Sequence, residues 1–497
     1  TGSIGGNQAL TLNSSGQTTI NGAIGSVTSL TTDAGGSVQL LGGTIATTNG
    51  AVSFNDTVTL GTHTQINTGN GAITFGNTID GGFDLTLNSA GVTTLLGNVG
   101  SLVRLANFIN TGSGTFALSG NVTTQGNVTL DNSLTIARDV SITSTAGTIA
   151  INNAINAADN DLTLSATDLT INSALTMGAG NLDLRAHRRI VLSNSTIASS
   201  SGTIALTTQN TSGSAVSLSL SAYDGSIDIK NSQISSDSGA ITLSANADGS
   251  ISGDFVGLLL GYEGAPSSIA SNTGEIRLTA KGGNSGGDND GVLLWRGRIT
   301  SQFGDMTLDG TGGSGGNGEG VNLYRSILES TGTGINAARI NLIGRTVTAP
   351  SGAYSVTSAV ATVPGSGIFT VDGDITIVGS TTTPNFTFGT FLNTPVIATG
   401  TGSLTVTQTG AAGVGADAEL GQFGSLEFTS GNVSLTSDRS INLNSDPANN
   451  AFSKIVTSST GNVSLTADRS ITLNSGTSIT SSTGDITLNA NLTNTAT

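Results

Sequence analysis

The chain has 497 residues, of which 71 are glycine, 10% are charged, 4% are aromatic and none is cysteine. The lack of cysteine excludes disulfides and thiolate metal sites, and the net charge of −16 disfavours binding to nucleic-acid phosphates. No run of about eighteen apolar residues, the length of a membrane-spanning helix, is present. The apolar residues alternate with polar ones rather than being scattered, which argues against disorder.

Residues 1–150 carry a repeat of about 75 residues. Residues 10–26 (LTLNSSGQTTINGAIGS) return as residues 85–101 (LTLNSAGVTTLLGNVGS). Residues 50–60 (GAVSFNDTVTL) likewise return as residues 126–136 (GNVTLDNSLTI). Repeats of this kind predict a stacked protein in which each unit contacts only its neighbours.

A shorter unit recurs inside these repeats: a glycine followed by alternating polar and aliphatic residues, as in residues 36–40 (GSVQL) and 71–75 (GAITF). Period-two alternation predicts a strand with one aliphatic face. We interpret the glycine as the residue whose permissive backbone angles allow the chain to turn a corner. Strands this short bury their aliphatic face only if successive coils stack in register.

The predicted fold is therefore all-β: a right-handed parallel β-helix, or β-solenoid, of roughly 20–25 coils with one irregular insertion. Each coil is expected to hold two or three short strands in about 20–24 residues. The rival architecture is a jelly roll or sandwich, which requires antiparallel hairpins with regular two-residue turns. Units that recur nearly unchanged favour the β-helix.

Residues 150–345 continue the pattern, so residues 1–345 are predicted to form one shaft. An unusually apolar run at residues 255–260 (FVGLLL) fits an elongated coil, a buried loop or a patch between subunits. Within 271–345, residues 274–301 and 304–330 form a further repeat with glycine-rich loops.

Residues 346–400 break the pattern and hold four of the six prolines. Proline is excluded from central strands, so this segment is predicted to form irregular loops or an appended element. Its aromatic residues Phe386, Phe388 and Phe391 are candidates for lateral or partner contacts, because exposed aromatics otherwise face water.

The shaft is expected to resume over residues 401–497, where a repeat of 30 residues relates residues 431–445 (GNVSLTSDRSINLNS) to residues 461–475 (GNVSLTADRSITLNS). Duplication this close indicates copied coils with their loops.

Acidic residues in the glycine-rich loops form a candidate metal site. Asp288 and Asp290 lie in one loop and Glu319 in the next copy, and Ca²⁺ is bound by carboxylate and carbonyl oxygens. The second copy lacks both aspartates, so a surface loop without metal explains the same residues.

Two aromatic residues occupy equivalent positions of this repeat. Trp295 and Tyr324 are each followed by arginine, which suggests an aromatic ladder that stacks on sugar rings. The alternative is a ladder that fills a corner of the core, covered by the arginine stems.

No catalytic constellation stands out, and the chain is predicted not to be an enzyme. Its Asp-Arg pair at 438–439 recurs at 468–469, as a structural turn or surface ion pair would. With three lysines in the whole chain, a basic groove for an acidic polysaccharide is not expected either.

Residues 461–476 (GNVSLTADRSITLNSG) and 80–95 (DGGFDLTLNSAGVTTL) resemble repeats of filamentous-haemagglutinin-like, two-partner-secretion exoproteins of bacteria and related adhesins. The resemblance covers the shaft and implies a right-handed β-helical shaft, export to the cell surface, and roles in adhesion, aggregation or biofilm. The Asn-Pro-Asn-Gly motif of the family's secretion domain is not found, so a shaft fragment, a processed segment or a subunit exported by another route is expected.

These observations predict a non-enzymatic extracellular rod with structural or adhesive function. It is expected to assemble end to end into a filament or to form the shaft of a longer adhesin, with other copies or surface glycans as partners. The alternative is a carbohydrate-binding or polysaccharide-cleaving β-helix. An ice-binding solenoid is a weaker fit, because it needs more uniform coils.

Overall fold

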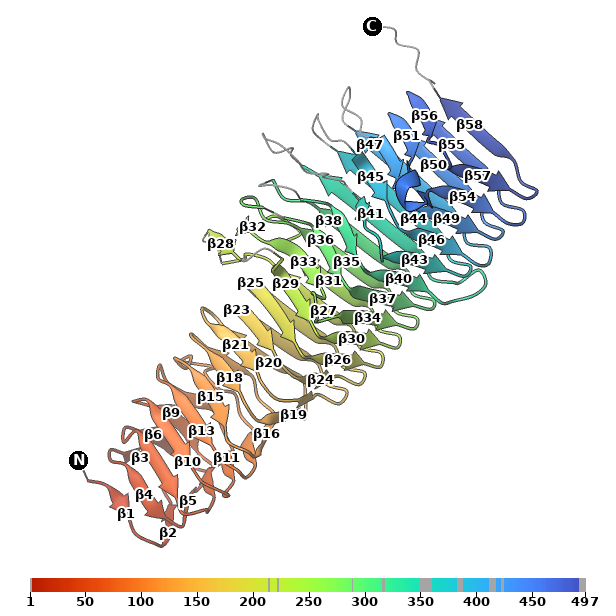
Figure 1. The fold of residues 1–497 in the computed structure, drawn as a ribbon. Coiled ribbons are helices and arrows are strands. Elements are labelled where there is room, and N and C mark those ends of the chain that lie inside the picture. Colours follow the sequence, from red (N-terminus) through yellow and green to blue (C-terminus); the bar gives the residue numbers. More distant parts are fainter. Residues whose placement is uncertain are drawn as a thin grey trace. The chain divides into compact units, whose positions relative to one another are not determined.

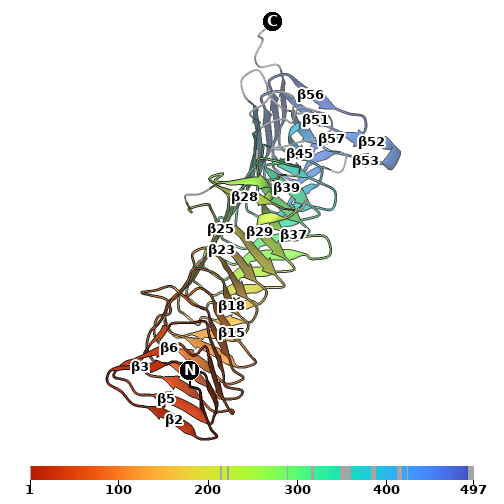
Figure 2. The same cartoon turned by 90° about the vertical axis from the view of Figure 1, so that its left-hand side faces the viewer.

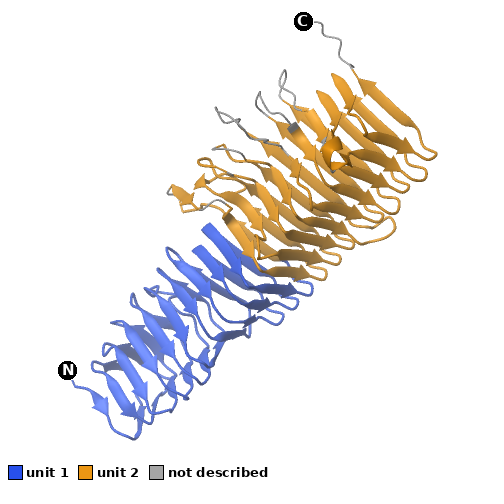
Figure 3. Cartoon of the chain, viewed as in Figure 1, with its two compact units in different colours: residues 1–203 blue, residues 204–497 orange. Residues whose placement is uncertain are grey.

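The computed structural model describes residues 2–212, 215–220, 223–287, 289–314, 318–347, 360–381, 388–410, 417–421 and 424–490 (Figure 1). These residues form parallel strands stacked coil upon coil, with one short 3₁₀ helix, η1 (Pro447–Asn449), inside a small antiparallel hairpin of β52 (Ser445–Asp446) and β53 (Ala451–Phe452). The predicted all-β parallel β-helix is confirmed. The chain divides into two compact units, residues 1–203 and 204–497 (Figure 3), and each is described by itself.

In unit 1 each early coil is built from three strands on three sides. One coil holds β2 (Ala9–Leu12), β3 (Gln17–Ile20) and β4 (Ile24–Val27). The next coil pairs with it in parallel on all three sides, through β5 (Ser29–Thr32), β6 (Ser37–Leu40) and β7 (Thr44–Thr47). Figure 2 shows β3 and β6 on one side and β2 and β5 on another.

The side that begins with β2 can be followed through the whole of unit 1. Leu10, Leu30 and Val52 are Cα neighbours there, so the first two coils span 20 and 22 residues, as expected. The ten strands of this side, among the described residues, are β2, β5, β8 (Val52–Phe54), β11 (Ile73–Phe75), β14 (Thr93–Leu95), β16 (Thr115–Leu118), β19 (Ser133–Ile136), β22 (Ile155–Asn156), β24 (Ala174–Thr176) and β26 (Thr196–Ser199).

Side-chain alternation builds the core of each coil. In β8 and β11 the residues Val52, Phe54, Ile73 and Phe75 are fully buried, while the residues between them are partly exposed. Phe54 and Phe75 stack with ring centroids 5.1 Å apart, one coil above the other. Like side chains therefore lie over like side chains, and each buried aliphatic or aromatic group contributes about 1.5–3 kcal/mol.

Unit 2 has the same plan with longer coils. Ile269, Ile299, Leu328 and Ile368 are successive Cα neighbours, so these coils span 30, 29 and 40 residues. Among the described residues this side of unit 2 holds nine stacked strands, fewer than a uniform coil of about 20–24 residues predicts.

Three parallel stacks run through the described residues of unit 2. The first consists of β27 (Ile204–Thr208), β31 (Ile241–Ala245), β35 (Ile276–Lys281), β38 (Met306–Thr311), β41 (Ile340–Thr346), β44 (Ile375–Thr381), β47 (Leu404–Gly410), β50 (Val433–Ser437), β55 (Val463–Ala467) and β58 (Ile486–Ala490). The second consists of β29 (Gly225–Lys230), β33 (Val256–Leu260), β36 (Val292–Trp295), β39 (Val321–Tyr324), β42 (Val360–Thr362), β45 (Phe388–Leu392), β48 (Asp417–Leu420), β51 (Ser440–Leu443) and β56 (Ser470–Leu473). The third consists of β30 (Gln233–Ser236), β34 (Ser267–Ser271), β37 (Gly297–Ser301), β40 (Ile327–Ser330), β43 (Gly367–Thr370), β46 (Pro395–Ala398), β49 (Ser425–Phe428), β54 (Lys454–Thr457) and β57 (Ser478–Ser481).

The described part of the proline-rich segment 346–400 continues these stacks. Strands β42 to β46 pair in parallel with the coils on either side, and Pro395 opens β46. The segment therefore contributes strands to the coil as well as loops, which differs from an appended element. Proline at the first position of a strand is compatible with that pairing.

The apolar run at 255–260 forms a strand covered on both faces. All five residues of β33 are buried. Leu258 and Leu260 pair with aliphatic residues of the inner face, whereas Leu259 lies between them and points to the opposite face. Nearby, β28 (Val216–Ser219) and β32 (Ile251–Asp254) form a small separate parallel pair over their own apolar cluster.

The recurrent glycine has a different role from the one that its backbone freedom suggests. Gly274 and Gly304 stand at the same corner of successive coils, and neither has a positive φ. A Cβ on Gly304 would lie 2.0 Å from the carbonyl oxygen of Gly274, and a Cβ on Gly274 would lie equally close to Gly239. Stacked corners approach too closely for any side chain, and this close approach is why the unit begins with glycine.

The residue after this glycine links the coils by hydrogen bonds. The backbone N–H of Ser403 donates to Asp374 Oδ1 (2.9 Å), and that of Asn432 donates to Ser403 Oγ (3.1 Å). In the following coils the backbone N–H of Asn462 donates to Asn432 Oδ1 (2.9 Å), and that of Asp485 donates to Asn462 Oδ1 (2.7 Å). We call this series the corner ladder. It satisfies backbone donors at each turn.

Candidate ligand-binding site

Four aromatic side chains gather on the outer face of the second stack of unit 2. Trp295 and Tyr324 are Cα partners in β36 and β39, with ring centroids 5.0 Å apart. Tyr223 meets Trp295 edge to face at 4.6 Å, and Tyr262 lies 5.0 Å from the same indole. Trp295 is thus the centre of an aromatic cluster contributed by four segments of the chain.

This aromatic cluster is built on a second apolar layer outside the coil core. Val256, Leu259 and Leu293 are buried, and Tyr223, Trp295 and Tyr324 pack against them. Leu259 and Leu293 are Cα partners, so the layer results from the same register that stacks the core. An aliphatic floor with aromatic walls is typical of small-molecule sites.

A cavity of about 230 Å³ opens among these side chains, and we call it the aromatic pocket. Its lining combines aromatic, aliphatic, acidic and amide groups from three segments, each one coil or more apart. The lining residues are Tyr223, Asp290, Leu293, Trp295, Glu319, Asn322 and Tyr324.

The polar side of the pocket is held by a network around Asn322. Asn322 Nδ2 donates to Asp290 Oδ2 at 3.0 Å and to Glu319 Oε2 at 3.2 Å. The backbone N–H of Glu319 donates to Asp290 Oδ1 at 2.8 Å. Asp290 is only 2% exposed, and these contacts orient two carboxylates toward one amide.

Two further polar atoms of the lining residues are buried without a hydrogen-bond partner among the described residues. One is the indole nitrogen Nε1 of Trp295, which can only donate, and the other is the amide oxygen Oδ1 of Asn322, which can only accept. An unpaired buried polar group costs about 1–3 kcal/mol, so the pair marks the pocket as a place where an external partner is stabilising.

The glycine-rich loops reach the outer face because glycine leaves room for them. A Cβ on Gly291 would lie 2.4 Å from the backbone nitrogen of Thr311. Asn289 is fully buried and fixes its loop, since its Oδ1 accepts from the N–H of Phe255 and its Nδ2 donates to the carbonyl of Ser285. The loop is thus anchored one residue before the acidic residue that it contributes to the pocket.

The structure merges two sites that the sequence analysis kept separate. Asp290 and Glu319, proposed for Ca²⁺, line the same cavity as Trp295 and Tyr324, proposed for sugars. Asp288 lies outside the described residues. Within the part of the chain that the structure describes, no group of three or more His, Cys, Asp and Glu side chains is placed to hold a metal ion.

The phenylalanines proposed for partner contacts do not belong to this pocket. Phe386 lies outside the described residues, and Phe388 begins β45. Phe391, in the same strand, is partly exposed and pairs in register with Ala361 and Glu419.

Sequence reasoning missed Tyr223 and Asn322. Asn322 occupies the position of Leu293 in the next copy of the repeat, and this change from aliphatic to amide was a visible signal. Tyr223 lies far away in the sequence and gave none.

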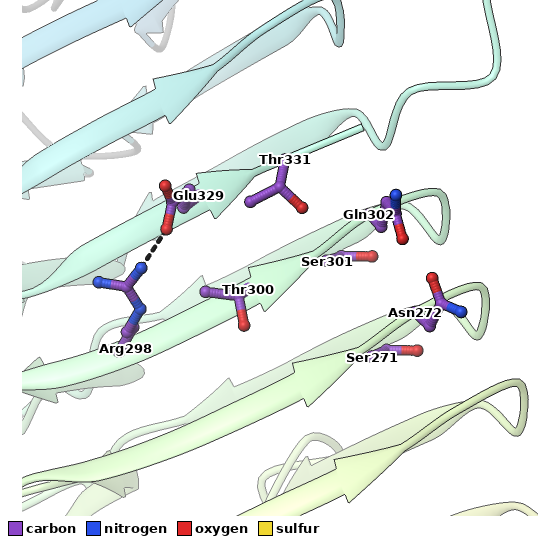
Figure 4. Close-up of a pocket in the computed structure, with 8 residues that line it drawn as sticks. All are labelled: Ser271, Asn272, Arg298, Thr300, Ser301, Gln302, Glu329 and Thr331. Atoms are coloured by element: carbon purple, nitrogen blue, oxygen red, sulfur yellow. Dashed lines mark hydrogen bonds and ion pairs between the residues drawn. The ribbon is translucent and has the colours of Figure 1, made fainter. Parts of the chain in front are cut away.

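Two other hollows lie in unit 2. A groove of about 410 Å³ crosses the third stack, where Arg298 pairs with Glu329 and the remaining lining is small and polar (Figure 4). A wider hollow of about 720 Å³ contains the Asp305–Arg339 ion pair and the exposed Ile335. Neither hollow includes a tyrosine or tryptophan.

Glu419 on β48 is unusual among the acidic residues for its burial. Burial raises the pKa of Glu419 to about 7, the hydrogen bond from Asn444 opposes this rise, and the neighbouring Asp417 carboxylate adds to it. Asp417 Oδ1 in turn lies 3.5 Å from Arg439 Nε. The arginine of the Asp438-Arg439 pair, which the sequence duplicates, therefore forms a surface ion pair with Asp417.

No helix among the described residues has the length and apolar character needed to cross a membrane. Searches with this chain find no matching protein-family model, no matching curated protein and no matching solved structure.

Proposed function

We propose that the protein is a non-enzymatic structural and adhesive shaft, displayed outside a bacterial cell. The observation that carries this proposal is the parallel register within each unit, in which side chains stack column by column. Such stacking suits an extended carrier of surface features, because each coil depends only on its neighbours and coils can be added without limit.

The corner ladder and the glycine corners support a mechanical role. Each coil is joined to the next by backbone pairing on three sides and by side-chain hydrogen bonds at the corner. Load along the stack is then shared among many bonds of about 1 kcal/mol each. In this proposal the shaft joins end to end with further copies or continues a longer adhesin, as the resemblance to two-partner-secretion exoproteins implies.

The test is surface display. The full chain, anchored on a non-adherent bacterium, is expected to confer attachment to glycan-bearing cells or aggregation of the carrier bacteria. Electron microscopy of purified protein at high concentration is expected to show filaments if copies join end to end. Display without attachment or aggregation, together with monomers at all concentrations, contradicts the proposal.

A second candidate function is carbohydrate binding or cleavage, which the aromatic pocket favours. Its aromatic walls and paired carboxylates are groups that both lectins and glycan-cleaving enzymes use. Release of reducing ends or unsaturated products from polysaccharides, lost in Glu319→Gln, would establish an enzyme. Binding without product release would leave the adhesive role in place.

A further inference from the structure

We infer that the aromatic pocket is a glycan site that takes one sugar ring of a neutral oligosaccharide. This inference rests on the proposed adhesive function and names the ligand class that the shaft presents. The cavity of about 230 Å³ lies below the roughly 300–1,000 Å³ of sites for drug-sized ligands, so it suits a single ring.

The apolar half of the pocket matches the C–H face of a pyranose. Leu293 forms the floor and is 2% exposed, while Trp295 and Tyr324 stand beside it, partly exposed, in successive coils. A sugar ring placed against an aromatic wall buries apolar surface on one side and leaves its hydroxyl groups free for the polar side.

The polar half matches hydroxyl groups rather than ions. A hydroxyl both donates and accepts, so the hydroxyl groups of a sugar match a lining whose residues carry an unpaired donor, the Trp295 N–H, and an unpaired acceptor, Asn322 Oδ1. The carboxylates of Asp290 and Glu319 add acceptors already oriented by Asn322. Charge-assisted hydrogen bonds of this kind are roughly twice as strong as neutral ones.

An organic cation fits the same pocket less well. An ammonium group offers only donors, so the Trp295 N–H would stay unpaired beside it. The aromatic cluster also carries cations of its own, since Lys230 Nζ lies 5.2 Å from the Tyr262 ring and the Arg325 guanidinium 5.4 Å from the Tyr324 ring. A calcium ion needs six to eight oxygen ligands, roughly, and the two carboxylates here share their amide partner instead.

The test uses the only tryptophan of the chain as its reporter. Trp295 lies in the pocket wall, so its fluorescence reports on ligand binding there without labelling. The intact protein is titrated with neutral hexose and N-acetylhexosamine oligosaccharides, and in parallel with tetramethylammonium chloride and with CaCl₂. A saturable change with at least one oligosaccharide, and none with the two salts, is expected.

Variants separate a binding pocket from a merely structural cluster. Trp295→Phe keeps an aromatic ring but removes the indole N–H, and calorimetry is expected to show about tenfold weaker binding. Glu319→Gln keeps the shape of the side chain and is expected to weaken binding by a similar factor. Glu329→Gln, in the groove of Figure 4, is the matched control and should leave binding unchanged.

The inference is overturned if no oligosaccharide produces a saturable change, or if tetramethylammonium or Ca²⁺ produces it instead. It is also overturned if binding occurs but Glu319→Gln and Glu329→Gln affect it equally, because the sugar then binds elsewhere. If Trp295→Phe does not fold, Glu319→Gln still tests the inference. Attachment conferred by a displayed protein that shows no saturable oligosaccharide binding would refute this inference and spare the adhesive function.

Discussion

Trp295 packs against Tyr324 of the next coil, with ring centroids 5.0 Å apart, because the two residues are Cα partners in a parallel stack. The same register that buries Leu294 over Leu323 on the inner face therefore builds the aromatic wall of the pocket on the outer face. The site is thus a product of repetition: a duplicated coil places two aromatic residues together wherever its copies stack.

The first prediction concerns the stacked core. Leu278 is fully buried between Leu243 and Leu308, so Leu278→Ala should destabilise unit 2 by about 2–5 kcal/mol through lost burial and a cavity. Its neighbour Arg277 is exposed on the opposite face, and Arg277→Ala should cost less than about 0.5 kcal/mol. Denaturant unfolding of both variants measures the difference, and equal losses would contradict the assigned inner face.

The second prediction concerns the glycine corner. Gly304→Ala places a methyl group 2.0 Å from the carbonyl oxygen of Gly274, so the stacked corners must separate, at a cost of about 1–3 kcal/mol. In Gly287→Ala the new methyl group meets no atom within 4 Å, and this variant is the control. Thermal unfolding should show a lower midpoint for Gly304→Ala alone. A control that loses as much would contradict close approach as the reason for the glycine, because chain entropy alone favours alanine in both variants.

The third prediction concerns the corner ladder. Asn432→Ala removes the acceptor for the backbone N–H of Asn462 and should cost about 1 kcal/mol. Asn432→Asp keeps an acceptor oxygen in the same place and should retain most of the stability. Hydrogen exchange at the backbone amide of Asn462 measures the effect at the site of the lost bond. Unchanged protection of this amide in Asn432→Ala would refute the corner ladder.

The fourth prediction concerns pH. Because burial raises the pKa of Glu419 to about 7, the folded state binds the proton more tightly than the unfolded state does. The contribution of Glu419 to the free energy of unfolding therefore rises as the pH falls from about 7 toward the ordinary pKa of a glutamate. At pH 8 the side chain is ionised and destabilises the folded state.

Glu419→Gln should accordingly stabilise the protein by about 1–2 kcal/mol at pH 8, a figure reduced for the screening of a partly hydrated group. This gain should vanish near pH 4. The exposed Glu275→Gln serves as the control with no such pH dependence. Unfolding midpoints at the two pH values test this, and a gain that is equal at both would contradict a raised pKa.

The strand pattern of residues such as 36–40 and 71–75 and its recurrence in nearly unchanged units were together sufficient to predict the fold class, because alternation is a property of local sequence and recurrence favours the stacking of like units. The role of glycine was misjudged for a physical reason. Backbone freedom is a property of one residue, whereas the approach of Gly304 to Gly274 depends on the neighbouring coil. The corner ladder was missed for the same reason, since its donors and acceptors lie one coil apart.

The candidate site was predicted in pieces. Trp295, Tyr324, Asp290 and Glu319 were each visible as unusual residues in a glycine-rich repeat, but only the register of β36 and β39 shows that they share one cavity. Tyr223 could not be predicted, because it precedes β29 and lies outside the repeat that holds Trp295 and Tyr324.

The stacking register itself can be measured by cross-linking, since the chain has no cysteine of its own. Ser434 and Ser464 are partly exposed Cα partners in β50 and β55. Parallel neighbours lie about 4.8 Å apart, within the roughly 4.4–6.8 Å that a disulfide spans. Under mild oxidation the double variant Ser434→Cys, Ser464→Cys should form an intramolecular disulfide, whereas Ser434→Cys, Thr466→Cys, about 8 Å apart, should not. A disulfide that forms only in the second pair, or equally in both, would contradict the coil register on which the core, the ladder and the pocket all depend.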